Sequence, residues 1–272
     1  MYFIVINCKI VGEGFPVVIL HGWSLDHSVM SGCLEPNFVK RQGWKRIYID
    51  LPGMGASKAQ ANIRNSDDML QAVLDFITLQ IPDEPFLIFG YSYGGLIARG
   101  VAHYLQKDVR GMLLIAPVIV SEPSKRNLPE KRVIKADSSL LSRLPLEDAS
   151  EFAAVSVIQG EEEWVRFNRE ILLPSRKADH SFLTQVRNNG YGFTFEMDTD
   201  TTINEYPVLI ITGRHDHIVG YKDAWGILDE YPNGAFSLLD LAGHHLQIEQ
   251  PNIFNALVNN WLDELESGYI NC

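Results

Sequence analysis

Short apolar runs typical of β-strands alternate with longer helical patterns along most of this chain, and this alternation restricts the fold more than any other feature. The strand-like runs are residues 1–10, 16–20, 47–49, 86–89, 112–115, 208–211 and 236–239. The helical patterns are residues 66–80, with Ser66 as the expected N-cap, 94–106, 221–230 and 252–266. Such alternation predicts a mostly parallel sheet with helices on both of its faces. We therefore expect an α/β fold with a doubly wound sheet.

The alternation stops between residues 122 and 205, where the sequence is rich in charge, punctuated by proline and helical in pattern. This segment leaves a strand that ends near Ala116 and returns to a strand at Pro207. In open α/β sheets that position lies above the carboxyl ends of the strands, where ligands bind. We predict a core domain made of residues 1–121 and 206–272, with residues 122–205 as a helical lid inserted after the sixth strand.

The composition and charge exclude several classes of partner. The 272 residues are 46% hydrophobic and 21% charged, which is typical of a globular chain rather than a disordered one. The formal net charge of −11 opposes binding to a nucleic-acid backbone or to an anionic membrane surface. We therefore expect a small-molecule substrate and no nucleic-acid or membrane partner. The sequence leaves the oligomeric state open.

Three features predict a cytoplasmic protein. The cysteines Cys8, Cys33 and Cys272 are odd in number and far apart, so they indicate neither a disulfide framework nor a metal site. The N-terminal residues lack the basic start and the small-residue cleavage site of a signal peptide. The longest apolar stretch, residues 112–120, is interrupted by Pro117 and is about half the ~20 residues that a membrane-spanning helix needs.

The segment Gly-Tyr-Ser-Tyr-Gly-Gly at residues 90–95 is the strongest local signal of chemistry. It lies between an apolar strand and a helical pattern, and it fits the Gly-x-Ser-x-Gly turn that presents a nucleophilic serine above a sheet. The glycines are needed because so tight a turn brings the strand and helix backbones together. The pattern predicts that Ser92 is a nucleophile and that the backbone amide of Tyr93, at the start of the helix, faces a developing oxyanion.

A serine nucleophile needs a base within hydrogen-bond reach and a third group that orients the base. Asp216 follows the strand 208–211, and the adjacent His244 and His245 follow the last strand. Both segments therefore reach the carboxyl edge of the sheet, where Ser92 also lies. The chain order of serine, aspartate and histidine is the order of the α/β-hydrolase arrangement rather than of other serine triads. We predict that Ser92, Asp216 and one of these histidines form a catalytic triad.

A second oxyanion donor is expected in the loop after the strand 16–20, which has the sequence His21-Gly22-Trp23. Gly22 lets the backbone approach the site closely, so that the amide of Trp23 points inward. For the side chain of His21 we prefer a structural role, in which the ring hydrogen-bonds the loop.

Four segments resemble the α/β-hydrolase superfamily, in its lid-bearing branch of small esterases, carbon–carbon hydrolases and non-metal haloperoxidase-like enzymes. They are residues 21–23, residues 50–57, residues 90–95, and the pair 213–216 and 242–251. In that family the catalytic histidine directly follows a glycine and stands five residues before a glutamate. The resemblance therefore selects His244, with Glu249 as that glutamate. A serine rather than an aspartate at position 92 disfavours dehalogenase and epoxide hydrolase activity.

The motifs and the resemblance together predict a serine hydrolase that cleaves a small, apolar carboxylic ester. Ser92 would attack the carbonyl carbon, His244 would move the protons and Asp216 would hold His244. The amides of Trp23 and Tyr93 would bind the oxyanion, and water would then hydrolyse the acyl-enzyme. This mechanism requires no metal and no organic cofactor.

Several alternatives remain open at this stage. The same fold and triad also serve carbon–carbon bond hydrolysis, amide hydrolysis and perhydrolysis. Some relatives are non-enzymatic small-molecule receptors, in which the lid responds to the ligand. A metal centre is a further alternative, because His215, His217 and His245 lie beside Asp216 and His244 in the sequence, but it leaves the serine turn unexplained.

The substrate pocket is expected to be mostly apolar and to lie between the lid and the loop that carries Trp23. Amphipathic lid helices that simply pack on the core domain would present the same apolar side chains. The candidate lining residues are Trp23, Leu25, Met30, Leu140, Leu141, Phe152, Trp164 and Phe167.

Overall fold

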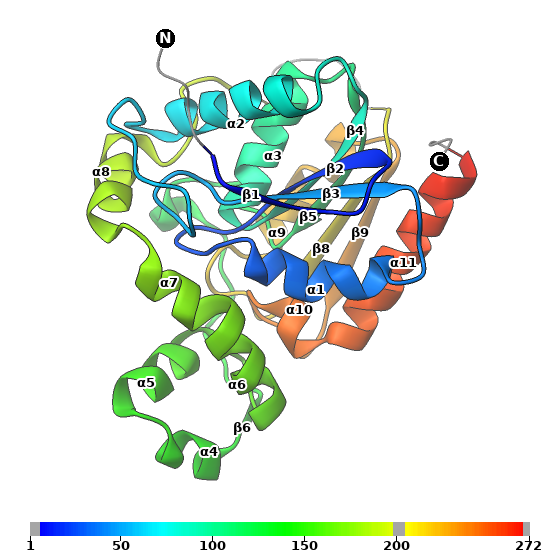
Figure 1. Ribbon diagram of the computed structural model, residues 1–272. Coiled ribbons are helices and arrows are strands. Elements are labelled where there is room, and N and C mark those ends of the chain that lie inside the picture. The colour runs from blue at the N-terminus through cyan, green and yellow to red at the C-terminus, as the bar shows by residue number, and fades with distance from the viewer. Residues whose placement is uncertain (1–5, 198–204, 269–272) are drawn as a thin grey trace.

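The computed structural model describes residues 6–197 and 205–268, and its main feature is a seven-stranded sheet (Figure 1). The strands are β1 (Cys8–Val11), β2 (Phe15–Leu20), β3 (Trp44–Ile49), β4 (Phe86–Tyr91), β5 (Val109–Ile115), β8 (Val208–Gly213) and β9 (Gly234–Leu239). Their spatial order is β1-β3-β2-β4-β5-β8-β9. The edge strand β1 runs antiparallel to β3, and every other neighbouring pair is parallel. The predicted mostly parallel sheet is confirmed; the part of its first strand at residues 1–5 lies outside the described residues.

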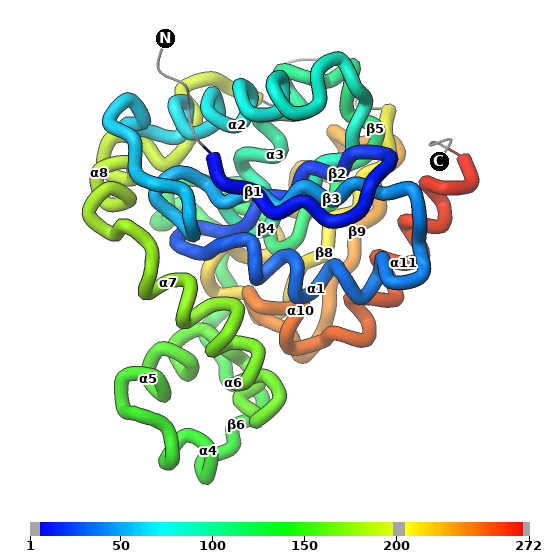
Figure 2. Tube along the Cα trace, viewed as in Figure 1, coloured from blue at the N-terminus to red at the C-terminus, as the bar shows by residue number. Residues whose placement is uncertain are grey.

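Helices cover both faces of the sheet, as Figures 1 and 2 show. Helices α1 and α11 lie side by side on one face, and α2 and α3 lie side by side on the other. Their bounds are α1 (Ser28–Phe38), α2 (Ser66–Gln80), α3 (Tyr93–Tyr104) and α11 (Pro251–Gly268). The helix predicted at 221–230 is two short pieces, α9 (Lys222–Gly226) and a 3-10 turn (Leu228–Glu230). The short helix α10 (Leu246–Glu249) precedes α11.

Two details of the helices differ from the prediction. The N-cap of α2 is Asn65, whose side chain accepts a hydrogen bond from the Asp68 amide at 2.9 Å. Ser66 is instead buried in the first turn, where its hydroxyl donates to the carbonyl oxygen of Tyr191 at 2.7 Å. Helix α1 has no counterpart in the prediction, since Pro36 lies inside it and reads as a helix breaker.

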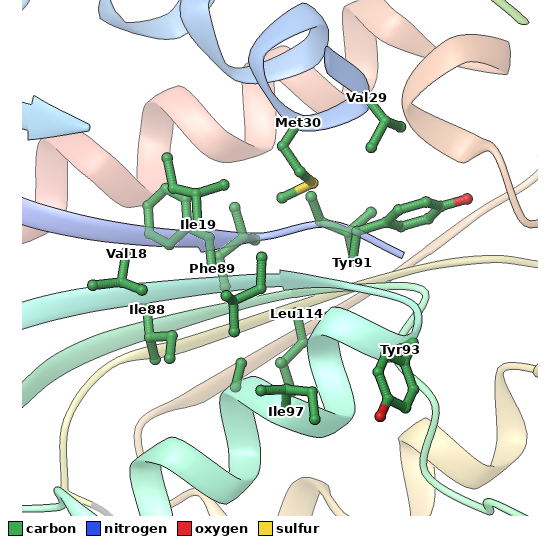
Figure 3. Close-up of a cluster of buried hydrophobic side chains, with 14 of the residues drawn as sticks. Val18, Ile19, Val29, Met30, Ile88, Phe89, Tyr91, Tyr93, Ile97 and Leu114 are labelled. Carbon is green, nitrogen blue, oxygen red and sulfur yellow. The ribbon is translucent and has the colours of Figure 1, made fainter. Parts of the chain in front are cut away.

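The core lies on both sides of the central strands (Figure 3). Every residue of β4 and β8 is buried, which explains why these strands are continuous apolar runs rather than alternating ones. In Figure 3 the side chains of Val29 and Met30 from α1 approach one face, and Ile97 from α3 packs on the other. Met30 is only 1% exposed. Its predicted place in a substrate pocket is therefore wrong, because α1 directs it into the core.

Residues 122–205 form a mostly helical insertion that joins β5 to β8, and its segment 198–204 lies outside the described residues. The insertion follows β5, which is the fifth strand in the order of the described chain. The prediction that it follows the sixth strand is therefore wrong, because among the described residues only one strand, β1, precedes β2. In Figure 1 the part from α4 to α6 projects beyond the core, and α7 and α8 run back along it. Its helices are α4 (Ser138–Arg143), α5 (Leu146–Val155), α6 (Glu161–Phe167), a π-helix (Asn168–Leu172), α7 (Leu173–Lys177) and α8 (His180–Gly190). Two short parallel strands, β6 (Lys135–Ala136) and β7 (Ile158–Gln159), complete it.

Across residues 6–197 and 205–268, the helices are all too short or too polar to span a lipid bilayer.

Candidate active site

The turn between β4 and α3 holds Ser92 in a backbone conformation that L-residues rarely adopt, with φ 54° and ψ −115°. Four backbone hydrogen bonds fix it. The Ser92 amide donates to the Ile115 carbonyl oxygen at 3.0 Å, and the amides of Gly95, Val118 and Leu96 donate to the Ser92 carbonyl oxygen at 2.9, 3.0 and 3.4 Å. A Cβ atom on Gly94 would lie 2.4 Å from the Leu20 carbonyl oxygen, so the turn needs glycine there. The fold therefore imposes the strain on Ser92.

Three loops at the carboxyl edge of the sheet bring Ser92, His244 and Asp216 into one hydrogen-bonded chain. Ser92 Oγ lies 3.0 Å from His244 Nε2, and His244 Nδ1 lies 2.9 Å from Asp216 Oδ2. All three residues are buried. An ionised carboxylate only accepts, so His244 donates from Nδ1 and its Nε2 accepts from the Ser92 hydroxyl. This is the arrangement that a general base acting on a serine requires.

Asp216 is held as a carboxylate although no part of it is exposed. Burial by itself would raise the pKa of Asp216, but the adjacent His244 and the amides of Val219 and Ile218 outweigh that effect and lower the pKa. Asp216 Oδ1 accepts from the Ile218 amide at 2.9 Å and from the Val219 amide at 3.0 Å. The loop thus satisfies one carboxylate oxygen and leaves the other for His244.

The segments that carry the two predicted oxyanion donors both lie close to Ser92. Tyr93 is the first residue of α3, so its amide has no acceptor within the helix. The loop that carries Trp23 passes close to the nucleophile, since a Cβ atom on Gly22 would lie 3.3 Å from Ser92 Cβ. The rings of Trp23 and Tyr93 pack edge to face with centroids 4.7 Å apart, which links the two segments.

His21 has the structural role that we expected for its side chain. The buried ring joins its own loop to the loop after β3: Nδ1 lies 2.7 Å from the Gly22 carbonyl oxygen, and Nε2 accepts from the Leu51 amide at 3.0 Å. Burial lowers the pKa of His21, so the ring is neutral and both nitrogens are occupied. It supports the loop of Trp23 and has no free nitrogen for proton transfer.

Glu249, which we recognised only as a sequence landmark, connects the histidine loop to the insertion. Its Oε2 accepts from the Gly243 amide at 2.6 Å, and its Oε1 accepts from the Val157 amide at 2.7 Å. Burial raises the pKa of Glu249 to about 7, against the opposing effect of these amides. A single buried carboxyl group therefore holds the residue before His244 against the segment that leads into β7.

His245, the neighbour of His244, is buried beside Tyr91, with 2.7 Å between His245 Nδ1 and Tyr91 Oη. Burial lowers the pKa of His245 to about 3, and the adjacent His244 adds to the shift. His245 is therefore neutral in the folded protein over the whole range in which an unfolded histidine takes up a proton.

We expect His245 to make the fold sensitive to acid. Because its pKa is lower in the folded than in the unfolded state, its contribution is fully present above about pH 6.5 and is lost as the pH falls, by roughly 2 kcal/mol at pH 5. Chemical denaturation at pH 7.5 and pH 5 measures this loss. The variant His245→Asn keeps a hydrogen-bonding group but does not titrate, so its stability should fall less. An equal fall in both proteins would contradict the assignment.

A cavity of about 510 Å³ lies between the insertion and the core, and Ser92 and His244 line it. Among the residues predicted to line a pocket, Trp23, Leu25 and Phe167 do so. The insertion also contributes residues that we did not predict, including Arg126, Arg187 and Tyr191, and the core contributes Ile218 and Val219. Ile218 and Val219 follow Asp216 by two and three residues, close to the end of a strand, and this position is a sequence signal for them. The sequence gives no such signal for Arg126, Arg187 and Tyr191.

Four other predicted pocket residues do not line this cavity. Phe152 and Trp164 are buried inside the insertion, where their rings pack with centroids 5.4 Å apart. Leu140 is buried on α4 and Leu141 is half-buried beside it. These apolar side chains serve the packing of the insertion itself, because its helices turn their apolar faces toward one another as well as toward the core.

The histidines considered for a metal centre have separate partners. His215 Nε2 lies 3.2 Å from Asp240 Oδ1, His217 Nε2 lies 3.0 Å from the Ala154 carbonyl oxygen, and His245 contacts Tyr91. Within the described ranges, no three histidine, cysteine, aspartate or glutamate side chains gather in a way that could hold a metal ion.

Comparison with known proteins agrees with the fold. A family model described as the alpha/beta hydrolase fold matches residues 16–251, so the chain belongs to the alpha/beta hydrolase family. A solved structure of an alpha/beta superfamily hydrolase from Oenococcus oeni PSU-1 superposes with a TM-score of 0.88 at 32% identity, over 96% of each chain. An esterase from Exiguobacterium antarcticum shares the fold, with a TM-score of 0.66 at 17% identity over 95% of each chain.

Two relatives match along nearly their whole length. A 2-hydroxymuconate semialdehyde hydrolase from Pseudomonas putida is 26% identical over 267 residues, which cover 94% of this chain and 90% of that protein. A pimeloyl-[acyl-carrier protein] methyl ester esterase from Shewanella woodyi is 25% identical over 267 residues, which cover 95% of this chain and 98% of that protein. The family is thus one of hydrolases, and its members similar to this chain include esterases.

Proposed function

We propose that the protein is a serine hydrolase that cleaves a small carboxylic ester through an acyl-enzyme. The observation that carries the proposal is the buried chain of hydrogen bonds from Ser92 Oγ through the His244 ring to Asp216. An esterase among the full-length relatives supports the same bond type. We also propose a cytoplasmic location.

In the proposed reaction, Ser92 Oγ attacks the carbonyl carbon while His244 Nε2 takes up the hydroxyl proton. The negative charge that forms on the carbonyl oxygen is stabilised by the amides of Trp23 and Tyr93, and Asp216 stabilises the imidazolium. The C–O bond to the alcohol then breaks, and His244 gives its proton to the leaving oxygen. A water molecule, deprotonated by His244, attacks the acyl-enzyme and releases the acid and free Ser92.

We propose that the insertion acts as a lid that shapes the substrate site. It supplies a large part of the cavity wall, including Phe167, Ile171 and Leu172, whereas the reacting groups come from the core. Its attachment to the histidine loop through Glu249 means that a movement of the insertion would be felt near His244. The cavity of about 510 Å³ is large enough for a small ester.

Carbon–carbon bond hydrolysis is the second candidate, because the relative from Pseudomonas putida is a 2-hydroxymuconate semialdehyde hydrolase. Such a reaction would use the same serine, histidine and oxyanion donors. Hydrolysis of 2-hydroxymuconate semialdehyde with no turnover of any ester would favour this candidate.

Hydrolysis of p-nitrophenyl esters of increasing acyl length tests the proposed function. We expect turnover of short and medium acyl chains and a steep fall in kcat/KM once the chain outgrows the cavity. Release of p-nitrophenol above the rate of a heat-inactivated sample is the readout. A folded protein that leaves every ester of the series intact would refute ester hydrolysis and favour the second candidate or a receptor.

A further inference from the structure

Two arginines, Arg126 and Arg187, line the same cavity as Ser92 and His244. In the part of the chain that the structure describes, neither guanidinium forms an ion pair with a carboxylate. The protein as a whole has 34 acidic and 23 basic residues, so partners for an arginine are plentiful. Two cations without a carboxylate partner beside a reactive serine therefore need a separate explanation.

Arg187 lies against two aromatic rings, that of Trp23 in the loop after β2 and that of Tyr191 at the end of α8. Its guanidinium carbon is 5.0 Å from the centroid of the Trp23 ring and 5.1 Å from that of Tyr191. Trp23 and Tyr191 in turn pack with centroids 5.1 Å apart. Arg187 is also exposed to solvent, so a ligand that enters the cavity can reach it. Its charge is thus positioned by ring contacts and by the Tyr191 hydroxyl, and these contacts leave other N–H groups of the guanidinium for a ligand.

Arg126 is braced by backbone carbonyl groups. Its Nε donates to the Val120 carbonyl oxygen at 2.8 Å, its Nη1 to that of Ile218 at 2.9 Å and its Nη2 to that of Ser121 at 3.3 Å. These three bonds leave one N–H on each terminal nitrogen, which faces the Tyr191 hydroxyl or a ligand. Ile218 also donates its amide to Asp216, so Arg126 is fixed directly on the loop of the candidate triad.

The guanidinium groups of Arg126 and Arg187 both lie near the hydroxyl group of Tyr191. Burial raises the pKa of Tyr191, and the positive charges of Arg126 and Arg187 partly offset that rise. One carboxylate, Glu151, also lines the cavity, but it is paired with Arg176 at 3.1 Å. The end of the cavity at Tyr191 is therefore positive and carries hydrogen-bond donors.

We propose that Arg126 and Arg187 form a subsite for a carboxylate, so that the substrate is an ester that bears a negative charge on the group reaching Tyr191. An ionised carboxylate is costly to bury in an apolar cavity unless it is paired, and arginine is suited to pairing because it donates two parallel hydrogen bonds. This subsite rests on the proposed function for the ester group, and it differs from the expectation of a small apolar substrate. Monoesters of dicarboxylic acids have this chemistry.

The test compares two series of p-nitrophenyl esters, the monoesters of dicarboxylic acids from succinate to suberate and the uncharged alkanoates of similar length. For the best member we expect kcat/KM to be about tenfold to a hundredfold higher than for its uncharged counterpart. The variant Arg187→Gln should bring that ratio close to one, because it should lower kcat/KM for the monoesters far more than for the alkanoates. Arg143→Gln, the same charge change on α4 outside the cavity, should leave the ratio unaltered.

Calorimetric titration with adipate gives a readout that does not depend on turnover. We expect wild type to bind adipate at least about tenfold more tightly than Arg187→Gln. If every ester is inert but adipate binds in this manner, ester hydrolysis fails and the subsite stands. If alkanoates are cleaved as well as the monoesters, and Arg187→Gln does not alter adipate binding, the subsite is overturned and ester hydrolysis stands.

Discussion

The variant Ser92→Ala is expected to lower kcat for ester hydrolysis by about 10⁴-fold or more. The reason is that the variant lacks the only group that the proposed mechanism uses to form the acyl-enzyme, whereas the oxyanion amides and the cavity remain. The small side chain fits the strained turn at least as well as serine, so the melting temperature should stay close to that of wild type. Initial rates of p-nitrophenyl ester cleavage under substrate saturation measure the effect.

The control for this experiment is Ser121→Ala. Ser121 lines the same cavity but has no hydrogen bond to His244. Its replacement should change kcat by less than about threefold. If Ser92→Ala kept more than about a tenth of wild-type kcat while folded, the nucleophile would be another group, and the geometry at the turn between β4 and α3 would have a structural purpose.

The variant Asp216→Asn is expected to lower kcat by about 10³-fold to 10⁴-fold. The oxygen of the new amide side chain would accept the hydrogen bonds from the Ile218 and Val219 amides, so its NH₂ group would face His244. His244 Nδ1 would then lose its acceptor. The ring then favours the tautomer with the proton on Nε2, which is unable to accept the proton of Ser92. The effect should appear mainly in kcat, because Asp216 does not contact the substrate.

The matched control is Asp240→Asn, because Asp240 also pairs with a histidine, His215, but at the surface. We expect its kcat to stay within about twofold of wild type. Single-turnover kinetics with a p-nitrophenyl ester would separate a slow acylation step from slow deacylation. Equal activity of wild type and Asp216→Asn would show that His244 is oriented by other contacts.

The sequence predicted that Ser92, His244 and Asp216 lie together, because their positions depend on local rules. The glycines of the turn at residues 90–95 reflect backbone contacts that any residue with a Cβ would break. Asp216 and His244 follow strands of one parallel sheet, and the carboxyl ends of such strands meet at one edge. The positions of the strands along the chain were therefore enough to predict that Ser92 and Asp216 lie close together, although they are more than 100 residues apart in the sequence.

The sequence predicted the substrate cavity less well, because apolar periodicity shows that a side chain is buried but not what it packs against. Met30, Phe152 and Trp164 are all buried, yet the first serves the core and the other two the insertion. Arg126 and Arg187 gave no signal, since their location in the cavity depends on how the insertion folds over the sheet. Tertiary packing, rather than the local sequence pattern, determines where these apolar side chains and the two arginines lie.

The most direct test of Ser92 as the nucleophile is to locate the residue that reacts with a fluorophosphonate. Trypsin should release residues 65–99 as one peptide, which contains Ser66 and Ser92. If Ser92 is the nucleophile, the peptide gains one phosphonyl group, fragmentation places this group on Ser92, and ester turnover falls in proportion to the labelling. A phosphonyl group on another residue, or unimpaired turnover after complete labelling of Ser92, would contradict this assignment.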